Sequence, residues 1–190
     1  MRSSSQSPFI AETRAWVEHA VIGLNLCPFA PAPALKGLIR YVVTDASTLD
    51  ALVTDMLEEL AQLAEASPSE VETTLLIHPH VLENFIDFNN FLDIADQALS
   101  ASGLEGEIQI ASFPPEYLFA HTAPDDIGNA TNRSPYPTLH LLRESSIARA
   151  VDSFGDTDRI SDANIATLER LGSEGWAALR QRCRDDLGTT

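Results

Sequence analysis

Basic residues are scarce in this chain: 12 Lys and Arg stand against 28 Asp and Glu, which gives a formal net charge of −16 over 190 residues. The deficit is concentrated, because no Lys or Arg occurs between Arg40 and Arg133. A surface of this kind repels phosphate groups. We therefore expect no binding to nucleic acid and no binding to an anionic membrane.

Cysteines and long apolar runs are scarce as well. Cys27 and Cys183 lie far apart in the sequence, which favours a reducing compartment over a disulfide framework. No apolar run approaches the roughly 18 residues that span a bilayer, and the first residues lack the apolar core of a secretion signal. We expect a soluble, cytoplasmic protein.

The chain length suits one domain with a sizeable core. We expect a disordered tail over residues 1–7 and a single α/β domain over residues 8–187. Apolar residues at intervals of three and four alternate along the chain with short β-branched runs. These patterns predict helices over residues 8–22, 47–66 and 82–99 and strands over residues 38–44, 71–77 and 107–113.

The expected helix ends carry capping signals. Ser7 and Pro8 begin the first helix, and a capping box of Ser47 and Asp50 begins the second. Strands that alternate with helices of this length favour a small parallel or mixed sheet of three to four strands packed by helices.

The segment from Phe113 to Tyr136 shows no regular pattern. It combines prolines with aromatic residues, so we expect a long ordered loop before the C-terminal helices. Residues 117–120 are the candidate for a short fourth strand, which would run antiparallel because its connection is too short for a crossover. Helices are expected from about Pro137 and over residues 162–172 and 173–187.

Ligands of open α/β sheets bind beyond the carboxyl ends of the parallel strands. The second predicted strand runs into His78-Pro79-His80, and in an extended segment residues two apart point to the same side. The long loop leaves the same edge of the sheet. We therefore expect a pocket in which His78 and His80 meet Asp125 and Asp126, as four catalytic candidates.

The chemistry of the two histidines has several interpretations. Two imidazoles on one side suit a divalent metal, for which the candidate third ligands are His121, Asp125, Asp126 and Asp45. Metal-free acid/base catalysis is an alternative. The structural alternative is a strand end at which His80 caps the following helix.

Other residues near this edge suit a small anionic molecule. Asn132, Arg133 and Tyr136 precede a predicted helix N-terminus, whose free amides favour a carboxylate or phosphate. Arg40 and His140 are further candidates for substrate binding. Alternatively, Arg133 pairs with Asp125 or Asp126 and fixes the loop.

Cys27 is a candidate nucleophile. A reactive thiol needs a nearby base or cation, and His78 or Arg40 would serve if the fold brought them close. A buried structural cysteine is the alternative.

Several long motifs resemble the uncharacterised bacterial family catalogued as domain of unknown function 1415, among them WVEHAVIGLNLCPFA, TTLLIHPH, QIASFPPEYLFA and TNRSPYPTLHLLRE. The resemblance spans residues 16–172 and implies a bacterial cytosolic protein of unassigned activity, without established catalytic residues. It also leads us to expect a histidine where this chain has Pro114 and a glutamine where it has Leu118. A metal ligand is therefore missing at position 114, and His121 is its candidate substitute.

Taken together, these patterns favour a small-molecule enzyme with a pocket of His, Asp and Arg side chains, in which His78 and His80 act either as metal ligands or as acid/base groups. Hydrolysis is the first reaction class to test. One alternative is a non-catalytic module that binds an anionic metabolite or a protein partner. Thiol chemistry at Cys27 is the other.

Overall fold

One four-stranded sheet forms the centre of the molecule. The computed structural model describes residues 7–154 and 158–186, so the first six residues of the predicted tail and Leu187 lie outside it. The strands, in chain order, are β1 (Ile39–Val43), β2 (Thr73–Ile77), β3 (Ile108–Phe113) and β4 (Thr138–Arg143). They lie in the order β1-β2-β4-β3, with β1 and β2 parallel and β4 antiparallel to both of its neighbours. The predicted α/β class and mixed sheet are confirmed.

The inner strand β4 occupies a segment for which the sequence predicts a helix, so that prediction is wrong. Leu139 and Leu142 are three residues apart, which fits a helix, but Leu139 and Leu141 are the fully buried pair. This interval of two is the period of a strand. Hydrogen bonding to a neighbouring strand on each side then outweighs the weak helical pattern. Helix α5 (Glu144–Phe154) begins only after β4 ends.

The predicted strand over residues 117–120 is also wrong, because these residues form an irregular loop. The place beside β3 is taken by β4 instead. In the predicted loop, residues Ile127–Asn132 form a 3-10 helix, η2. The loop starts at the end of β3 and returns to the start of β4, so it lies at the carboxyl edge of β1, β2 and β3 as expected.

The predicted helices form with shifted ends. α1 (Pro8–Trp16) continues into a π-helix, η1 (Val17–Ile22), and α4 covers Phe85–Ala101. α3 (Leu49–Glu65) is capped by Thr48, whose side chain accepts a hydrogen bond from the Ala51 amide, rather than by Ser47. α6 (Asp158–Asp185) breaks at Gly172, where φ is 70°, so the two predicted C-terminal helices meet there. Ser7, assigned to the tail, is buried at the start of α1.

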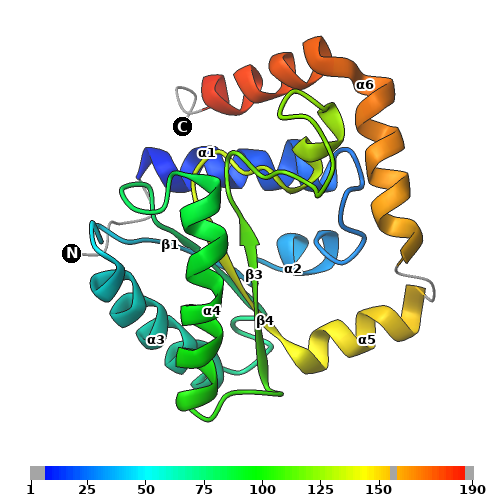
Figure 1. The fold of residues 1–190 in the computed structure, drawn as a ribbon. Coiled ribbons are helices and arrows are strands. Elements are labelled where there is room, and N and C mark those ends of the chain that lie inside the picture. Colours follow the sequence, from blue (N-terminus) through cyan, green and yellow to red (C-terminus); the bar gives the residue numbers. More distant parts are fainter. Residues whose placement is uncertain (1–6, 155–157, 187–190) are drawn as a thin grey trace.

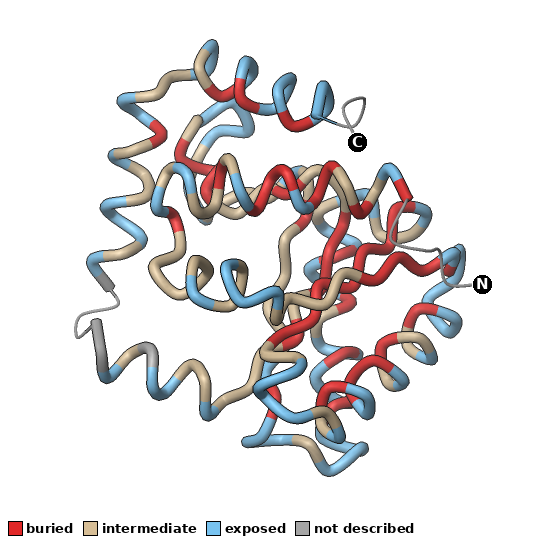
Figure 2. Tube along the Cα trace, turned by 180° about the vertical axis from the view of Figure 1, so that it is seen from behind, coloured by how far each residue is buried: buried red, intermediate tan, exposed pale blue. Residues whose placement is uncertain are grey.

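Helices cover both faces of the sheet (Figure 1). α3 and α4 pack on one face, where Phe88 and Phe91 contact a core that includes Leu76. α1 and η1 lie over the other face, and the last part of α6 packs against α1 and η2 at the edge of the sheet, so that Trp16 and Trp176 join a second core (Figure 1). Buried residues follow the strands and α1, whereas the short α2 (Pro31–Leu35) contains no buried residue (Figure 2). Among the helices of the two described ranges, none has both the length and the apolar character needed to cross a membrane.

Candidate functional site

The two histidines of the HPH motif point to different parts of the molecule. β2 ends at Ile77 and the chain turns over residues 79–80, so the extended geometry that we expected does not form. The His78 ring packs against Phe88 of α4, at 5.0 Å between centroids, while the exposed His80 ring packs against Phe9 of α1, at 5.8 Å.

His78 is a neutral, sealed side chain. Its Nδ1–H donates to the Val81 carbonyl at 2.9 Å, and its Nε2 is buried without a hydrogen-bond partner among the described residues. Burial lowers the pKa of His78 to about 4, although the hydrogen bond to Val81 acts against this shift. The free nitrogen therefore has no route to a ligand in this conformation.

The predicted partners of the histidines are not brought to them. Asp125, Asp126 and His121 are exposed on the loop, where Asp126 accepts a hydrogen bond from the Gly128 amide. In the part of the chain that the structure describes, no three His, Cys, Asp or Glu side chains gather as a metal site requires. The metal and catalytic roles of these residues stay predictions, now without a shared geometry.

Arg133 and Asn129 hold the loop together. Arg133 donates through Nε to the Tyr117 carbonyl at 2.9 Å and through Nη2 to the Pro124 carbonyl at 3.0 Å. It thus fixes the loop through carbonyls, and not through Asp125 or Asp126. The fully buried Asn129 accepts from the Phe119 amide and donates to Ala123.

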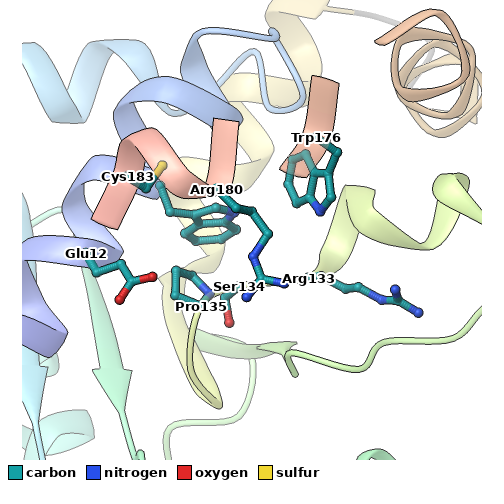
Figure 3. A pocket seen from close by; sticks show the side chains of 8 residues that line it. Glu12, Arg133, Ser134, Pro135, Trp176, Arg180 and Cys183 are labelled. Atoms are coloured by element: carbon teal, nitrogen blue, oxygen red, sulfur yellow. The ribbon is translucent and has the colours of Figure 1, made fainter. Parts of the chain in front are cut away.

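The loop packs against α6 and α1 without leaving room for a ligand. Ser134 and Pro135 lie close to Arg180 of α6, and Trp176 and Arg133 border the same space, with the Arg133 guanidinium pointing away from it (Figure 3). The space between them is about 10 Å³, which is at most one water. The neighbouring residue of the predicted clamp, Asn132, is half-buried at the end of η2.

Two further candidates for substrate binding are engaged in buried pairs. The Tyr136 hydroxyl donates to the buried Glu12 carboxylate at 2.5 Å, and burial together with this hydrogen bond raises the pKa of Tyr136. Arg40 forms two hydrogen bonds with Glu59, at 2.8 and 3.3 Å, and Glu59 is completely buried. Both pairs stabilise the fold and leave these groups little freedom to bind a ligand.

A cavity of about 510 Å³ lies on the face of the sheet that α3 and α4 do not cover. Its floor consists of strand residues, and its walls come from α1, η1, the segment Cys27–Pro33 and α5. The floor residues are Ile39, Thr73, Leu75, Ala111, Phe113, His140 and Leu142. A volume in the range of roughly 300–1,000 Å³ with a mainly apolar lining and a few polar groups is typical of small-molecule sites.

His140 lies in the middle of this floor. In the sheet it pairs with Leu75 of β2 on one side and Ala111 of β3 on the other. Its ring contacts Phe113, at 5.9 Å between centroids. The half-buried His140 is one of the residues that line the cavity, and burial lowers its pKa to about 4. His140 is therefore neutral at pH 7.

A hydrogen-bond relay fixes the tautomer of His140. The Thr73 hydroxyl lies 2.6 Å from the Leu141 carbonyl, which can only accept, so the single hydroxyl proton points to that oxygen. His140 Nε2 lies 2.7 Å from the same hydroxyl and must therefore be the donor. This assignment leaves a lone pair on Nδ1.

The lone pair on Nδ1 is open to the cavity. Nδ1 of His140 has no hydrogen-bond partner among the described residues. Unlike Nε2 of His78, it is not fully buried. The two histidines thus share a low pKa but differ in the accessibility of their unpartnered ring nitrogen. Only His140 offers a fixed acceptor to a bound molecule.

Cys27 belongs to the wall of the same cavity. Its predecessor, Leu26, packs in one apolar cluster with Leu75, the direct neighbour of His140 in the sheet. Burial raises the pKa of the Cys27 thiol, while hydrogen bonds from the Phe29 and Ala30 backbone act in the opposite direction. The thiol is therefore protonated at pH 7 and would need a base in order to react.

Among the described residues that line the cavity, the charged ones are Glu72, Arg143 and Arg149, and each of them is already paired. Arg149 of α5 donates to Glu72 at 3.3 Å and to Ser146 at 2.9 Å. Arg143 donates to the Leu63 and Ala66 carbonyls at 2.6 Å and closes the C-terminus of α3. The remaining lining is apolar or neutral.

The sequence provides Cys27 and His140 as separate candidates, but it predicts neither their shared cavity nor the role of Thr73. Thr73 could be found only from the pairing of β2 with β4, because the hydroxyl that orients His140 belongs to the neighbouring strand. A helix predicted over residues 137–143 hides that pairing. No local motif marks Asn129 as the residue that organises the loop.

Comparison with known proteins gives a family but no activity. A family model described as a protein of unknown function, DUF1415, matches residues 8–178. No curated protein and no solved structure matches the chain.

Proposed function

The chain belongs to the DUF1415 family, whose function is unknown, and we propose that it binds a small, mainly apolar molecule in the cavity over the sheet, with His140 as the hydrogen-bond acceptor. The observation that carries this proposal is the His140–Thr73–Leu141 relay, which fixes the lone pair of Nδ1 in a mainly apolar cavity.

The relay selects for a ligand that carries a donor. A buried acceptor that stays unpaired costs free energy, so a hydroxyl or N–H group beside Nδ1 is favoured over a carbon atom of the same size. The apolar floor contributes affinity through burial of the rest of the ligand. A phenol, an indole or a neutral amide with a short hydrocarbon part fits these requirements.

The experiment compares two probes of equal shape, 4-propylphenol and 4-propyltoluene, in which a methyl group replaces the hydroxyl. NMR titration should show that the wild type prefers the phenol by about tenfold, the value of one hydrogen bond. His140→Phe should bind both probes equally, because it keeps an aromatic ring but removes the acceptor. Equal binding of the two probes by the wild type contradicts the proposal.

An anionic ligand, which the sequence favoured, is the competing occupant. 4-Propylbenzoate tests it, because a carboxylate cannot donate to Nδ1 and would have to displace Glu72 from Arg149. Tighter binding of the benzoate than of the phenol, lost in Arg149→Gln, would favour an anion. Because Arg149 is already paired with Glu72, we expect the phenol to bind more tightly than the benzoate.

A second candidate function is supported by the presence of Cys27 and His140 in one cavity. In this version His140 Nδ1, a weak base because of its low pKa, accepts the thiol proton only as the sulfur attacks an electrophilic carbon of the bound molecule, so no thiolate forms beforehand. Phenacyl bromide is a suitable apolar probe: a C–S bond forms, the C–Br bond breaks, bromide leaves and the proton moves to His140. The expected result is alkylation of Cys27 that slows at least tenfold in His140→Phe.

Cys183 is the internal reference for this experiment, because it is buried in the contact between α6 and α1. Alkylation of Cys27 at the same rate in the wild type and in His140→Phe would remove His140 as the base. The binding proposal would be unaffected by that result, since it depends on the phenol preference alone.

A further inference from the structure

We infer that a groove between the start of α3 and the outer side of α4 is a docking site for a basic, amphipathic helix of a partner protein. The groove has a volume of about 580 Å³ and is separate from the sheet-face cavity. This groove lies on a different layer of helices, so it can bind a partner whether or not the sheet-face cavity holds a ligand.

Exposed apolar side chains concentrate at this groove. Among the described residues, four large hydrophobic side chains are exposed: Leu35, Leu49, Ile86 and Ile94. Leu49 and Ile94, at 41% and 43% exposure, line the groove, and Ile86, at 59%, is on the neighbouring turn of α4. Apolar residues that gather on one surface, rather than scatter singly, indicate an interaction site.

The groove has the length of a helical segment. Glu83, Asp87, Asn90 and Ile94 follow each other along α4 and its N-terminal extension, and Phe91 forms the buried floor. The ten helical residues from Phe85 to Ile94 rise by about 15 Å, which matches just under three turns of a second helix. Amphipathic helices place an apolar stripe into grooves of this kind.

The charge around the groove determines which partner fits. Glu83 and Asp87 are exposed within it, Asp50 and Asp93 are exposed beside it, and no Lys or Arg lines it. The ionisable residue of opposite type in the lining is His80, whose ring is held against Phe9. A segment that carries Lys or Arg along the edges of its apolar stripe is complementary to this rim.

The same charge disfavours the other occupants. A second copy of this chain, with a net charge of −16, would bring one acidic surface against another. Nucleic acid and anionic lipid are repelled for the same reason.

The backbone at one wall is strained, which agrees with a functional surface. Leu82 lines the groove with φ of 61°, a left-handed conformation that is rare for a branched apolar side chain. The conformation places Leu82 between the turn after β2 and the N-cap of α4 at Asn84.

The test uses a fluorescent 15-residue helix of Leu and Lys and an otherwise identical helix of Leu and Glu, measured by anisotropy at 150 mM salt. The Leu/Lys peptide should bind, and the Leu/Glu peptide should not. The double variant Leu49→Ser/Ile94→Ser should weaken binding at least tenfold. Leu35→Ser, at 89% exposure on α2, is the matched control and should leave binding unchanged.

A second pair of variants separates docking from general attraction to an acidic protein. Glu83→Gln/Asp87→Asn should weaken binding, whereas Glu65→Gln/Glu70→Gln, at the opposite end of α3, should not. All of these side chains are exposed, so circular dichroism should show an unchanged fold. Equal losses in both charge variants, or no loss in Leu49→Ser/Ile94→Ser, would overturn the inference. Self-association of the chain that Leu49→Ser/Ile94→Ser abolishes would overturn it as well.

Discussion

Nε2 of His140 lies 2.7 Å from the Thr73 hydroxyl, which in turn donates to the Leu141 carbonyl. This relay connects two neighbouring strands and orients a neutral imidazole toward the cavity. For this reason His140, and not the fully buried His78, can accept a hydrogen bond from a molecule in the cavity.

Thr73→Val removes the acceptor of the His140 N–H while keeping the shape of the side chain. We expect a loss of about 1–3 kcal/mol in the free energy of unfolding, because a buried donor and the Leu141 carbonyl lose their partner. Urea unfolding measures this loss. The preference for 4-propylphenol over 4-propyltoluene should fall as well, since the tautomer is no longer fixed.

Thr74→Val is the matched control on the same strand. The Thr74 hydroxyl is buried without a hydrogen-bond partner among the described residues, so its removal should be neutral or stabilising. Equal losses in the two variants would show that the relay contributes nothing specific.

The low pKa values of His78 and His140 predict acid sensitivity. Their pKa is about 4 in the folded state, below the ordinary value of 6.5, so the unfolded chain binds more protons between these limits. Stability is complete above about pH 6.5 and falls as the pH decreases toward 4. At pH 5 each histidine should lower the free energy of unfolding by about 2 kcal/mol relative to its value above pH 6.5.

Urea unfolding of the wild type and His140→Phe at pH 7 and pH 5 checks this origin. The variant should lose a smaller part of its stability between the two pH values, by about 2 kcal/mol, because one of the two histidines is gone. An identical pH dependence in both proteins would assign acid sensitivity to other groups.

Arg40→Met should destabilise the protein by about 3 kcal/mol, because it removes the Arg40 guanidinium from the buried Glu59 carboxylate. The double variant Arg40→Met/Glu59→Met should recover much of this loss, since no uncompensated charge remains. Chemical denaturation gives both values. If Arg40 instead binds a ligand, the single variant will be stable and only ligand binding will suffer.

Asn129→Ala should release the loop over residues 114–126. The Phe119 amide and the Thr122 hydroxyl lose their common acceptor, and Ala123 loses a donor. Limited proteolysis should then cut this segment faster than in the wild type. Asn132→Ala, in a half-buried position at the end of the same 3-10 helix, is the comparison and should leave cleavage slow.

The sequence predicts the elements that local periodicity defines. Three strands and the long helices follow from apolar spacing, and the loop beyond Phe113 follows from its prolines and aromatic residues. β4 is different, because Leu139 and Leu142 match a helix and only pairing with β2 and β3 decides for a strand.

The predicted helix in place of β4 explains why the predicted pocket differs from the observed cavity. With residues 137–143 as a helix, His140 cannot be placed between Leu75 and Ala111 on the sheet, and Thr73 has no reason to contact it. The geometry expected of the HPH motif is wrong for a separate reason. Its same-side geometry requires the strand to continue through His80, whereas β2 ends at Ile77.

The tautomer and titration of His140 test the central claim most directly. A two-bond proton–nitrogen correlation spectrum of protein labelled with ¹⁵N-histidine, compared with His140→Phe for assignment, reports both. The structure predicts a proton on Nε2, a titration midpoint near pH 4, and a shift of the Nδ1 resonance when 4-propylphenol is added. A proton on Nδ1, or an Nδ1 resonance that does not respond to the phenol, would contradict it.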